Sequence, residues 1–141
     1  TQYLNNPEAT AKSFKDGWFY PGDLGYLTEQ GALILQGRKD DMMIFDGMNI
    51  YPAEIENALS SHPAVAEVAA FAITHERLQD VPAAAVTLKE PISEKELIDF
   101  CKAPLGIKHP RRVFVLREFP RNQMGKILKR ELSSAVAKML A

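Results

Sequence analysis

The 141-residue sequence contains one cysteine, three histidines and no long apolar run. A single cysteine, Cys101, excludes a disulfide within the chain. His62, His75 and His109 stand far apart, with no cluster at metal-ligand spacing, so the sequence predicts no dedicated metal site. No segment approaches the roughly 20 apolar residues that span a bilayer, and the first residues lack the basic-then-apolar pattern of a signal peptide. We therefore expect a cytoplasmic protein without a membrane span.

The overall composition is that of a globular protein. The sequence is 46% hydrophobic and 25% charged, which excludes a disordered or fibrous chain. At this length we expect one domain with an appended piece. Such a chain is too small to house a large two-substrate active site alone.

Charge is distributed unevenly along the sequence. Residues 1–101 carry 7 basic and 16 acidic side chains, whereas residues 102–130 carry 9 basic and 1 acidic. The second segment should attract anions. The alternatives are a solvated basic surface, a phosphate or nucleotide site, and a nucleic-acid site. Nucleic acid is the least favoured partner, because the basic residues lack interleaved aromatic side chains for stacking.

Local patterns predict loops and hairpins in the first part of the chain. Gly47 or Asn49 can supply the positive φ that a tight turn needs. The predicted segments are a loop over residues 1–13, a hairpin with strands at 26–27 and 32–35, a charged, solvent-accessible joint at 37–41, and a second hairpin with strands at 42–45 and 50–51 around a turn at 46–49.

The remaining sequence predicts helices interleaved with strands. The segments are a helix from Pro52, strands at 65–73 and 83–88 separated by a polar loop at 74–82, a helix after a Ser93–Glu96 capping box that Pro104 and Gly106 stop, a strand at 112–116, a loop at 120–126, and a helix from Leu128 onward. This order predicts an α+β fold, in which about three helices pack on a small sheet of mostly antiparallel strands.

Two features could carry chemistry. Gly125 and Lys126 lie in a basic loop before a helix, where backbone amides favour an anion and a glycine lets the lysine move. The loop is not a P-loop, because the GxxxxGK[ST] spacing fails. Asp23 could accept hydrogen bonds from ribose hydroxyls, or bond to its own backbone as turn aspartates commonly do. Neither feature alone defines a function.

Three longer motifs occur together in the sequence: GWFYPGDLG, GRKDDMMIFDGMNIYPAEIE and PRNQMGKILKREL. In order and separation they resemble the late signature motifs of the adenylate-forming superfamily, which contains acyl-CoA synthetases, adenylation domains of peptide synthetases and luciferases. The resemblance covers nearly all of residues 17–132. It implies that residues 1–39, with their hairpin, are the tail of a large N-terminal domain that is missing here. Residues 40–141 would then form a mobile C-terminal domain.

The resemblance also implies roles for individual residues. Lys126 would be the catalytic lysine of adenylation, bridging the substrate carboxylate and the α-phosphate as negative charge builds. One departure is Pro21, which stands where the family usually has threonine or serine before the Gly-Asp pair. The other implied roles are nucleotide binding by Asp23 and Arg38, a hinge at Asp40, and a CoA channel lined by Gly47, Met48 and Asn49, with no metal ligand in this chain.

The segment GMNIYPAEIE resembles the form found in medium-chain, long-chain and aromatic acyl-CoA ligases. The expected function is therefore that of an AMP-forming acid:CoA ligase, which uses a fatty or aromatic carboxylic acid, ATP with Mg²⁺, and CoA. The acid pocket and most contacts to Mg²⁺ would lie in the enzyme's own N-terminal domain, so we expect the isolated chain to be inactive. The alternatives are an acyl-AMP ligase that loads a carrier protein, and a non-catalytic fragment or docking module.

Overall fold

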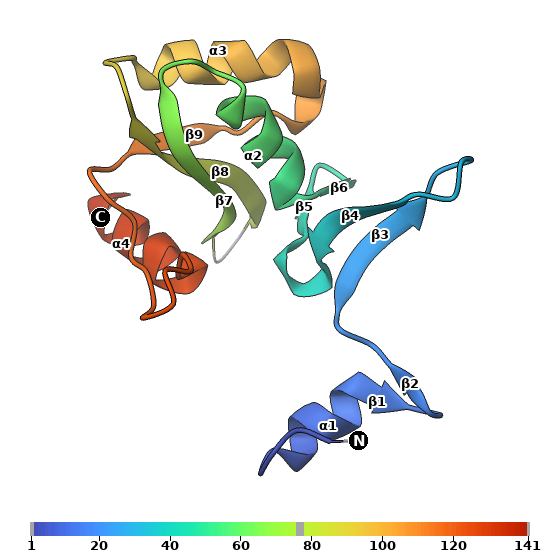
Figure 1. Cartoon of the computed structure of the whole chain (residues 1–141). Coiled ribbons are helices and arrows are strands. Elements are labelled where there is room, and N and C mark those ends of the chain that lie inside the picture. Colours follow the sequence, from blue (N-terminus) through green and yellow to red (C-terminus); the bar gives the residue numbers. More distant parts are fainter. Residues whose placement is uncertain (1, 76–77, 141) are drawn as a thin grey trace. The chain divides into compact units, whose positions relative to one another are not determined.

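The computed structural model describes residues 2–75 and 78–140 of the chain (Figure 1). The residues divide into two compact units, Thr1–Asp40 and Asp41–Ala141. Four α-helices and nine β-strands lie within the described residues. None of these helices is long and apolar enough to cross a membrane.

The first unit begins with a short helix where the sequence predicts a loop. Helix α1 (Pro7–Ser13) follows Asn6, whose side chain accepts a hydrogen bond from the backbone N–H of Ala9 at 2.9 Å. Pro7 at the first helical position has the φ that a helix needs. Asparagine capping and proline thus start a helix that has no buried residue. The prediction of a loop failed because it relied on apolar periodicity alone.

Two small antiparallel ribbons complete the first unit. Strand β1 (Phe14–Lys15) pairs with β2 (Trp18–Phe19), and β3 (Asp23–Leu27) pairs with β4 (Leu33–Arg38). The second pair confirms the predicted hairpin and extends it at both outer ends. As a result, Asp23 and Arg38 are direct neighbours across the ribbon.

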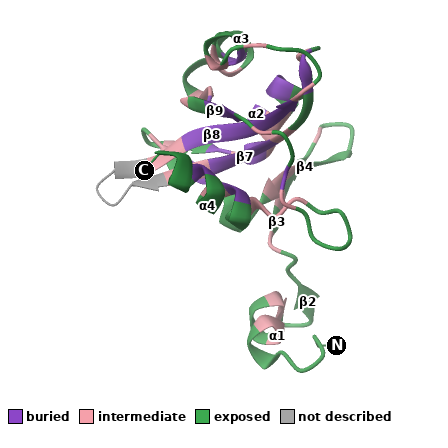
Figure 2. Cartoon of the chain, turned by 90° about the vertical axis from the view of Figure 1, so that its left-hand side faces the viewer, coloured by how far each residue is buried: buried purple, intermediate pink, exposed green. Residues whose placement is uncertain are grey.

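Many large apolar side chains of the first unit are exposed, and none of residues 2–40 is buried (Figure 2). A contiguous exposed apolar patch would be typical of a surface that packs against another part of a protein. The exposed set includes Trp18, Phe19, Tyr20, Tyr26, Leu27, Leu33, Ile34 and Leu35.

A three-stranded sheet is the centre of the second unit. Its order is β7-β8-β9, with β7 antiparallel and β9 parallel to the middle strand. A separate hairpin of β5 and β6 precedes it. The elements are the 3-10 turn η1 (Lys39–Asp41) at the boundary of the units, β5 (Met43–Phe45), β6 (Met48–Ile50), α2 (Pro52–Ser60), β7 (Val65–His75), β8 (Leu78–Leu88), α3 (Glu94–Leu105), η2 (Gly106–Lys108), β9 (Arg112–Val115) and α4 (Lys129–Leu140). This arrangement confirms the predicted α+β class.

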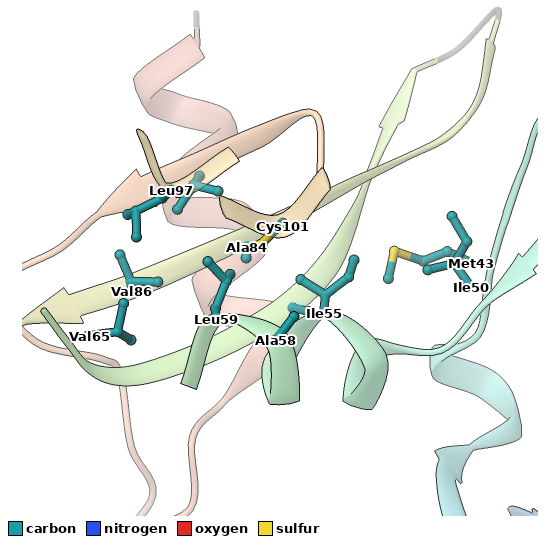
Figure 3. Close-up of a cluster of buried hydrophobic side chains, with 12 residues drawn as sticks. Met43, Ile50, Ile55, Ala58, Leu59, Val65, Ala84, Val86, Leu97 and Cys101 are labelled. Atoms are coloured by element: carbon teal, nitrogen blue, oxygen red, sulfur yellow. The ribbon is translucent and has the colours of Figure 1, made fainter. Parts of the chain in front are cut away.

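The two faces of this sheet are covered by different elements. Side chains alternate along β8, so that Ala84 and Val86 face one way while Ala83 and Ala85 face the other. The first face packs against α2, α3 and the β5-β6 hairpin (Figure 3). The second face packs against α4 through Leu132 and Val136. The alanines are fully buried, and their small side chains allow helices to approach closely on both faces.

Strands β7 and β8 are longer than the sequence predicts. The polar loop expected at 74–82 is wrong for most of its length, because β7 runs to His75 and β8 starts at Leu78; residues 76 and 77 lie outside the described residues. Pro82 lies inside the middle strand, opposite Ala72. Ala70 lies two residues before Ala72 on β7, and its N–H points away from β8, towards Glu56. Because residue pairs two positions apart in an antiparallel ladder have the same hydrogen-bonding geometry, the nitrogen of Pro82 likewise points away from β7. Strand β9 begins to pair one residue later, so the proline interrupts no hydrogen bond.

Helix α3 confirms the capping box. Glu96 N–H donates to Ser93 Oγ at 3.2 Å, and Ser93 N–H donates to Glu96 Oε2 at 3.1 Å. Pro104 lies within the last turn rather than after it, and the helix ends before Gly106. Cys101 points into the core from this helix and is fully buried. Burial raises the pKa of its thiol to about 11, so it is a packing residue and not a reactive one.

Candidate functional site

Asp23 and Arg38 form one candidate site at the open end of the β3-β4 hairpin. Arg38 Nη1 lies 3.6 Å from Asp23 Oδ1, and both side chains keep part of their surface exposed. The N–H of Lys39 donates to the carbonyl of Gly22 at 2.8 Å, which closes the ribbon beside the pair. The carboxylate thus offers acceptor oxygens, and the guanidinium offers a fixed set of donors beside them.

A cleft of about 640 Å³ surrounds this pair within the first unit. Besides Asp23 and Arg38, its lining includes Tyr20, Lys39 and Asp40. Hydroxyl groups could bond to the carboxylate there, and a phosphate could bond to the cations. The structure therefore brings together three residues that the sequence singled out, namely the two nucleotide-site candidates and the hinge candidate.

Asp40 is the last residue of the first unit and the middle residue of η1. Its Oδ2 lies 3.4 Å from Lys12 Nζ, and both side chains are largely exposed. An exposed ion pair of this kind contributes about 0–1 kcal/mol. Lys12 and Asp40 both belong to the first unit, so this pair does not link the two units.

Gly47 lies in a two-residue turn that joins β5 to β6. Asp46 and Gly47 both have positive φ, +52° and +76°, as a type I′ turn requires. Phe45 pairs with Met48 across the turn, so Met48 and Asn49 belong to β6. This corrects the predicted four-residue turn at 46–49. The type I′ turn is shorter because its twist matches that of the strands it connects.

We expect Gly47→Ala to destabilise the second unit without a steric clash. A Cβ at this position would meet no atom within 4 Å, but φ +76° costs an L-residue about 1–2 kcal/mol. Chemical denaturation of the chain should show this loss. Asn49→Ala, on the exposed part of β6, is the control and should stay within about 0.5 kcal/mol. Equal stability of Gly47→Ala and the unmodified chain would contradict a turn that depends on glycine.

Lys126 lies in a loop between β9 and α4 whose backbone is held by internal hydrogen bonds. Asn122 Oδ1 accepts from the backbone N–H of Met124 at 3.0 Å and of Lys126 at 2.9 Å. Gly125 has φ +82°, and its carbonyl accepts from Arg121 Nη1 at 2.9 Å. The side chain of Lys126 is exposed, and within the described residues no carboxylate pairs with it. A rigid loop thus presents a lysine to solvent.

Asn122 and Arg121 were not singled out from the sequence. An asparagine followed three residues later by a glycine is a signal for a turn in which the Asn side chain bonds to the backbone ahead of it. That signal was present in RNQMG. The bond from Arg121 to the carbonyl of Gly125 has no comparable sequence pattern.

Gly47 and Lys126 lie on opposite sides of the second unit's sheet. The β5-β6 hairpin packs through Met43 and Ile50 on the face that carries α2 and α3. The loop of Lys126 leads into α4, and its neighbour Ile127 packs on the other face. Figure 1 shows the same arrangement, with α4 and its preceding loop across the sheet from β5 and α2. The second unit thus carries two separate loops, the Gly47 turn and the Lys126 loop, on different sides of its sheet.

Most basic residues of segment 102–130 pair with carboxylates elsewhere in the second unit. This pairing neutralises much of the local charge and favours a structural role for the segment over a nucleic-acid surface. The pairs among the described residues are Lys102–Asp99, Lys108–Glu54, Arg112–Glu94, Arg121–Glu67 and Lys129–Glu56. Within these residues there is also no group of three or more His, Cys, Asp or Glu side chains that could hold a metal ion.

The sequence of the second unit matches a known protein family. Residues 54–126 match the family model of the AMP-binding enzyme C-terminal domain. The match covers most of α2, the three-stranded sheet, α3 and the loop up to Lys126. The chain therefore belongs to this family.

Individual relatives are longer than this chain. The 2-succinylbenzoate–CoA ligase of Bacillus cereus is 43% identical over 138 residues, which are 97% of this chain and 29% of that protein. The o-succinylbenzoate CoA synthetase of Bacillus subtilis, solved with its acyl-adenylate intermediate, is 43% identical with a TM-score of 0.85; the match covers 93% of this chain and 27% of that one. A Mycobacterium tuberculosis fatty acyl CoA synthetase is 37% identical with a TM-score of 0.73, covering 98% and 28%. The chain thus spans less than a third of the relatives it matches.

Proposed function

We propose that this chain is the C-terminal part of an AMP-forming acid:CoA ligase. The single observation that carries the proposal is that the Gly47 turn and the Lys126 loop belong to opposite faces of one sheet, in a unit that begins directly after Asp40. An enzyme that runs two half-reactions at one site needs two sets of groups, presented one after the other. Rotation of the second unit about the joint would exchange them.

In the first half-reaction, a carboxylate oxygen attacks the α-phosphorus of ATP. The new P–O bond gives acyl-AMP, and the bond to the leaving oxygen breaks to release pyrophosphate. Asp23 would accept hydrogen bonds from the ribose hydroxyls, and Arg38 would contact the ribose or phosphate. Lys126 would lie between the carboxylate and the α-phosphate, where its charge offsets the negative charge that builds in the transition state. Mg²⁺ would enter with the phosphates of ATP, held mainly by the N-terminal domain.

In the second half-reaction, the sulfur of CoA attacks the acyl carbonyl carbon. The C–S bond forms, AMP leaves with the electrons of the broken C–O bond, and the thiol proton passes to solvent. The Gly47 turn would line the channel for the pantetheine arm, together with Met48 and Asn49. A glycine at the tip leaves room for the thiol, since no side chain projects there.

We propose an aromatic carboxylic acid as the substrate, with 2-succinylbenzoate as the first candidate. The support is the relatives named for that acid, which are 43% identical to this chain, compared with 37% for the fatty acyl CoA synthetase. The acid pocket would lie in the N-terminal domain, and relatedness to enzymes named for this acid is what supports the choice.

The test is acid-dependent release of AMP and formation of thioester by the complete enzyme that contains this chain. We expect CoA thioester with 2-succinylbenzoate, and weaker activity with a panel of fatty acids. Thioester with a fatty acid alone would replace the proposed substrate but keep the reaction. Acyl-AMP that forms and reacts with a carrier protein, but never with CoA, would favour the carrier-loading alternative and remove the channel role of Gly47. No acid-dependent AMP release would overturn the proposal.

A further inference from the structure

Glu56 links two elements that lie on opposite faces of the sheet. It belongs to α2, and its Oε1 accepts a hydrogen bond from the backbone N–H of Ala70 at 2.9 Å, at the free edge of β7. The same oxygen accepts from Lys129 Nζ at 2.6 Å. Lys129 is the first residue of α4, on the other face. The carboxylate therefore ties the end of the Lys126 loop to the sheet edge.

Glu67 makes the corresponding contact at the start of the same loop. Its Oε1 pairs with Arg121 Nη2, while the other nitrogen of that guanidinium holds the carbonyl of Gly125. The second carboxylate oxygen of Glu67 accepts from Thr87 Oγ1 at 3.5 Å, and Thr87 is only 7% exposed. Glu67 lies opposite Thr87 in the register of β7 and β8. At this distance the contact is weak, so the pair with Arg121 is the main contact of the Glu67 carboxylate.

We propose that Glu56 and Glu67 are positioning residues for Lys126, acting through Lys129 and Arg121; this inference rests on the proposed role of Lys126 in adenylation. The internal hydrogen bonds make residues 121–126 a rigid loop, so its placement depends on how its two ends are attached. One carboxylate holds each end.

The Glu56 attachment is a stronger candidate for a fixed geometry than an ordinary surface ion pair, whereas the side chains of Arg121 and Glu67 are 37% and 44% exposed. The Glu56 side chain is 26% exposed and that of Lys129 is 35% exposed, so water screens this pair less than it screens an exposed one. Glu56 also satisfies a backbone N–H that β7 would otherwise leave unpaired at the sheet edge. A shift of the loop by about 1 Å would move the lysine out of reach of the reacting phosphate, and displacements of that size cost up to roughly 100-fold in rate.

The chain contains a matched control at the opposite edge of the same sheet. Glu94 of α3 accepts from the backbone N–H of Val113 at 3.1 Å and from Arg112 Nε at 2.7 Å. Like Glu56, Glu94 therefore accepts hydrogen bonds from both a backbone N–H of an edge strand and a cationic side chain. Arg112 and Val113 lie in β9, and neither belongs to the Lys126 loop. Loss of this carboxylate tests the structural effect of an edge glutamate without moving the lysine.

The experiment compares Glu56→Gln, Glu67→Gln and Glu94→Gln in the complete enzyme. Each variant is assayed for acyl-AMP formation and, separately, for thioester formation from supplied acyl-AMP. We expect Glu56→Gln and Glu67→Gln to lower the rate of acyl-AMP formation by roughly 10- to 100-fold, mainly in kcat, while thioester formation changes by less than about twofold. Glu94→Gln should leave the ratio of the two rates unchanged. An equal fall in both half-reactions, or no change in either, would overturn the inference.

A second variant tests the same contact from the cationic side. Lys129→Gln should reproduce the selective loss, and the double variant with Glu56→Gln should lose no more than either alone, because both remove one interaction. Additive losses would contradict the assignment, and Lys129→Gln decides the matter even if Glu56→Gln fails to fold. Lys126→Ala is measured alongside. If it shows no selective loss of acyl-AMP formation, the proposed role of Lys126 is what fails, whatever the glutamate variants do.

Discussion

Replacement of Lys126 by alanine in the complete enzyme should reduce acyl-AMP formation by roughly 100- to 1000-fold, the range observed when one preorganised donor to a transition-state charge is removed. Thioester formation from supplied acyl-AMP should stay close to its original rate, because we propose that this step uses the other face of the second unit. Pyrophosphate exchange measures the first reaction, and CoA consumption measures the second.

Stability should not change in this variant. Lys126 is exposed and pairs with no carboxylate among the described residues, so its removal should alter the free energy of unfolding by no more than about 0.5 kcal/mol. The matched control is Lys95→Ala on α3, where a lysine that is 87% exposed forms an ion pair with Asp99 of its own helix. That variant should keep both activities. Equal losses of both half-reactions in Lys126→Ala would show that the lysine does not act in adenylation alone.

Replacement of Asp40 by proline should impair thioester formation by roughly tenfold or more while acyl-AMP formation is largely retained, if the joint must turn between the two steps. Proline holds φ near −65°, which lies within the range of a 3-10 turn such as η1. The variant should therefore fold with this conformation of the joint, but could not rotate freely about it. Single-turnover measurements of each half-reaction give the two rates.

Asp40→Ala separates the backbone from the side chain at the same position. It removes the ion pair with Lys12 but leaves φ free, and the exposed pair contributes little. We expect both half-reactions to continue at nearly their original rates. If Asp40→Ala slowed thioester formation as much as Asp40→Pro, the side chain rather than backbone rotation would matter, and the hinge assignment would be wrong.

Features that depend on near neighbours were predictable from the sequence. The Ser93–Glu96 capping box and the β3-β4 hairpin involve residues a few positions apart, and the structure confirms both. The Gly47 turn was also located, although the second strand of its hairpin begins at Met48, two residues closer to the glycine than predicted. In each case the residue types themselves set the backbone angles or supply the hydrogen bond.

Features that depend on a distant partner were missed. The segment around Pro82 looked like a loop because it is polar and contains proline, yet it pairs with β7 on a side where the missing N–H is not needed. The basic segment suggested an anion surface, whereas many of its charges meet carboxylates far away in sequence, such as Glu56 with Lys129 across 73 positions. No local pattern reports such pairs, because they form only after the strands have aligned.

The sequence by itself identified the residues of the candidate site. They are Lys126, which follows a glycine, Gly47 at the tip of a turn, and Asp23 and Arg38 near a charged joint. Tertiary structure alone decided that Asp23 and Arg38 are neighbours, that Gly47 and Lys126 use opposite faces of one sheet, and that two glutamates hold the ends of the Lys126 loop. The physical reason is that the register of paired strands sets which side chains share a face, and register is a property of segments brought together by folding.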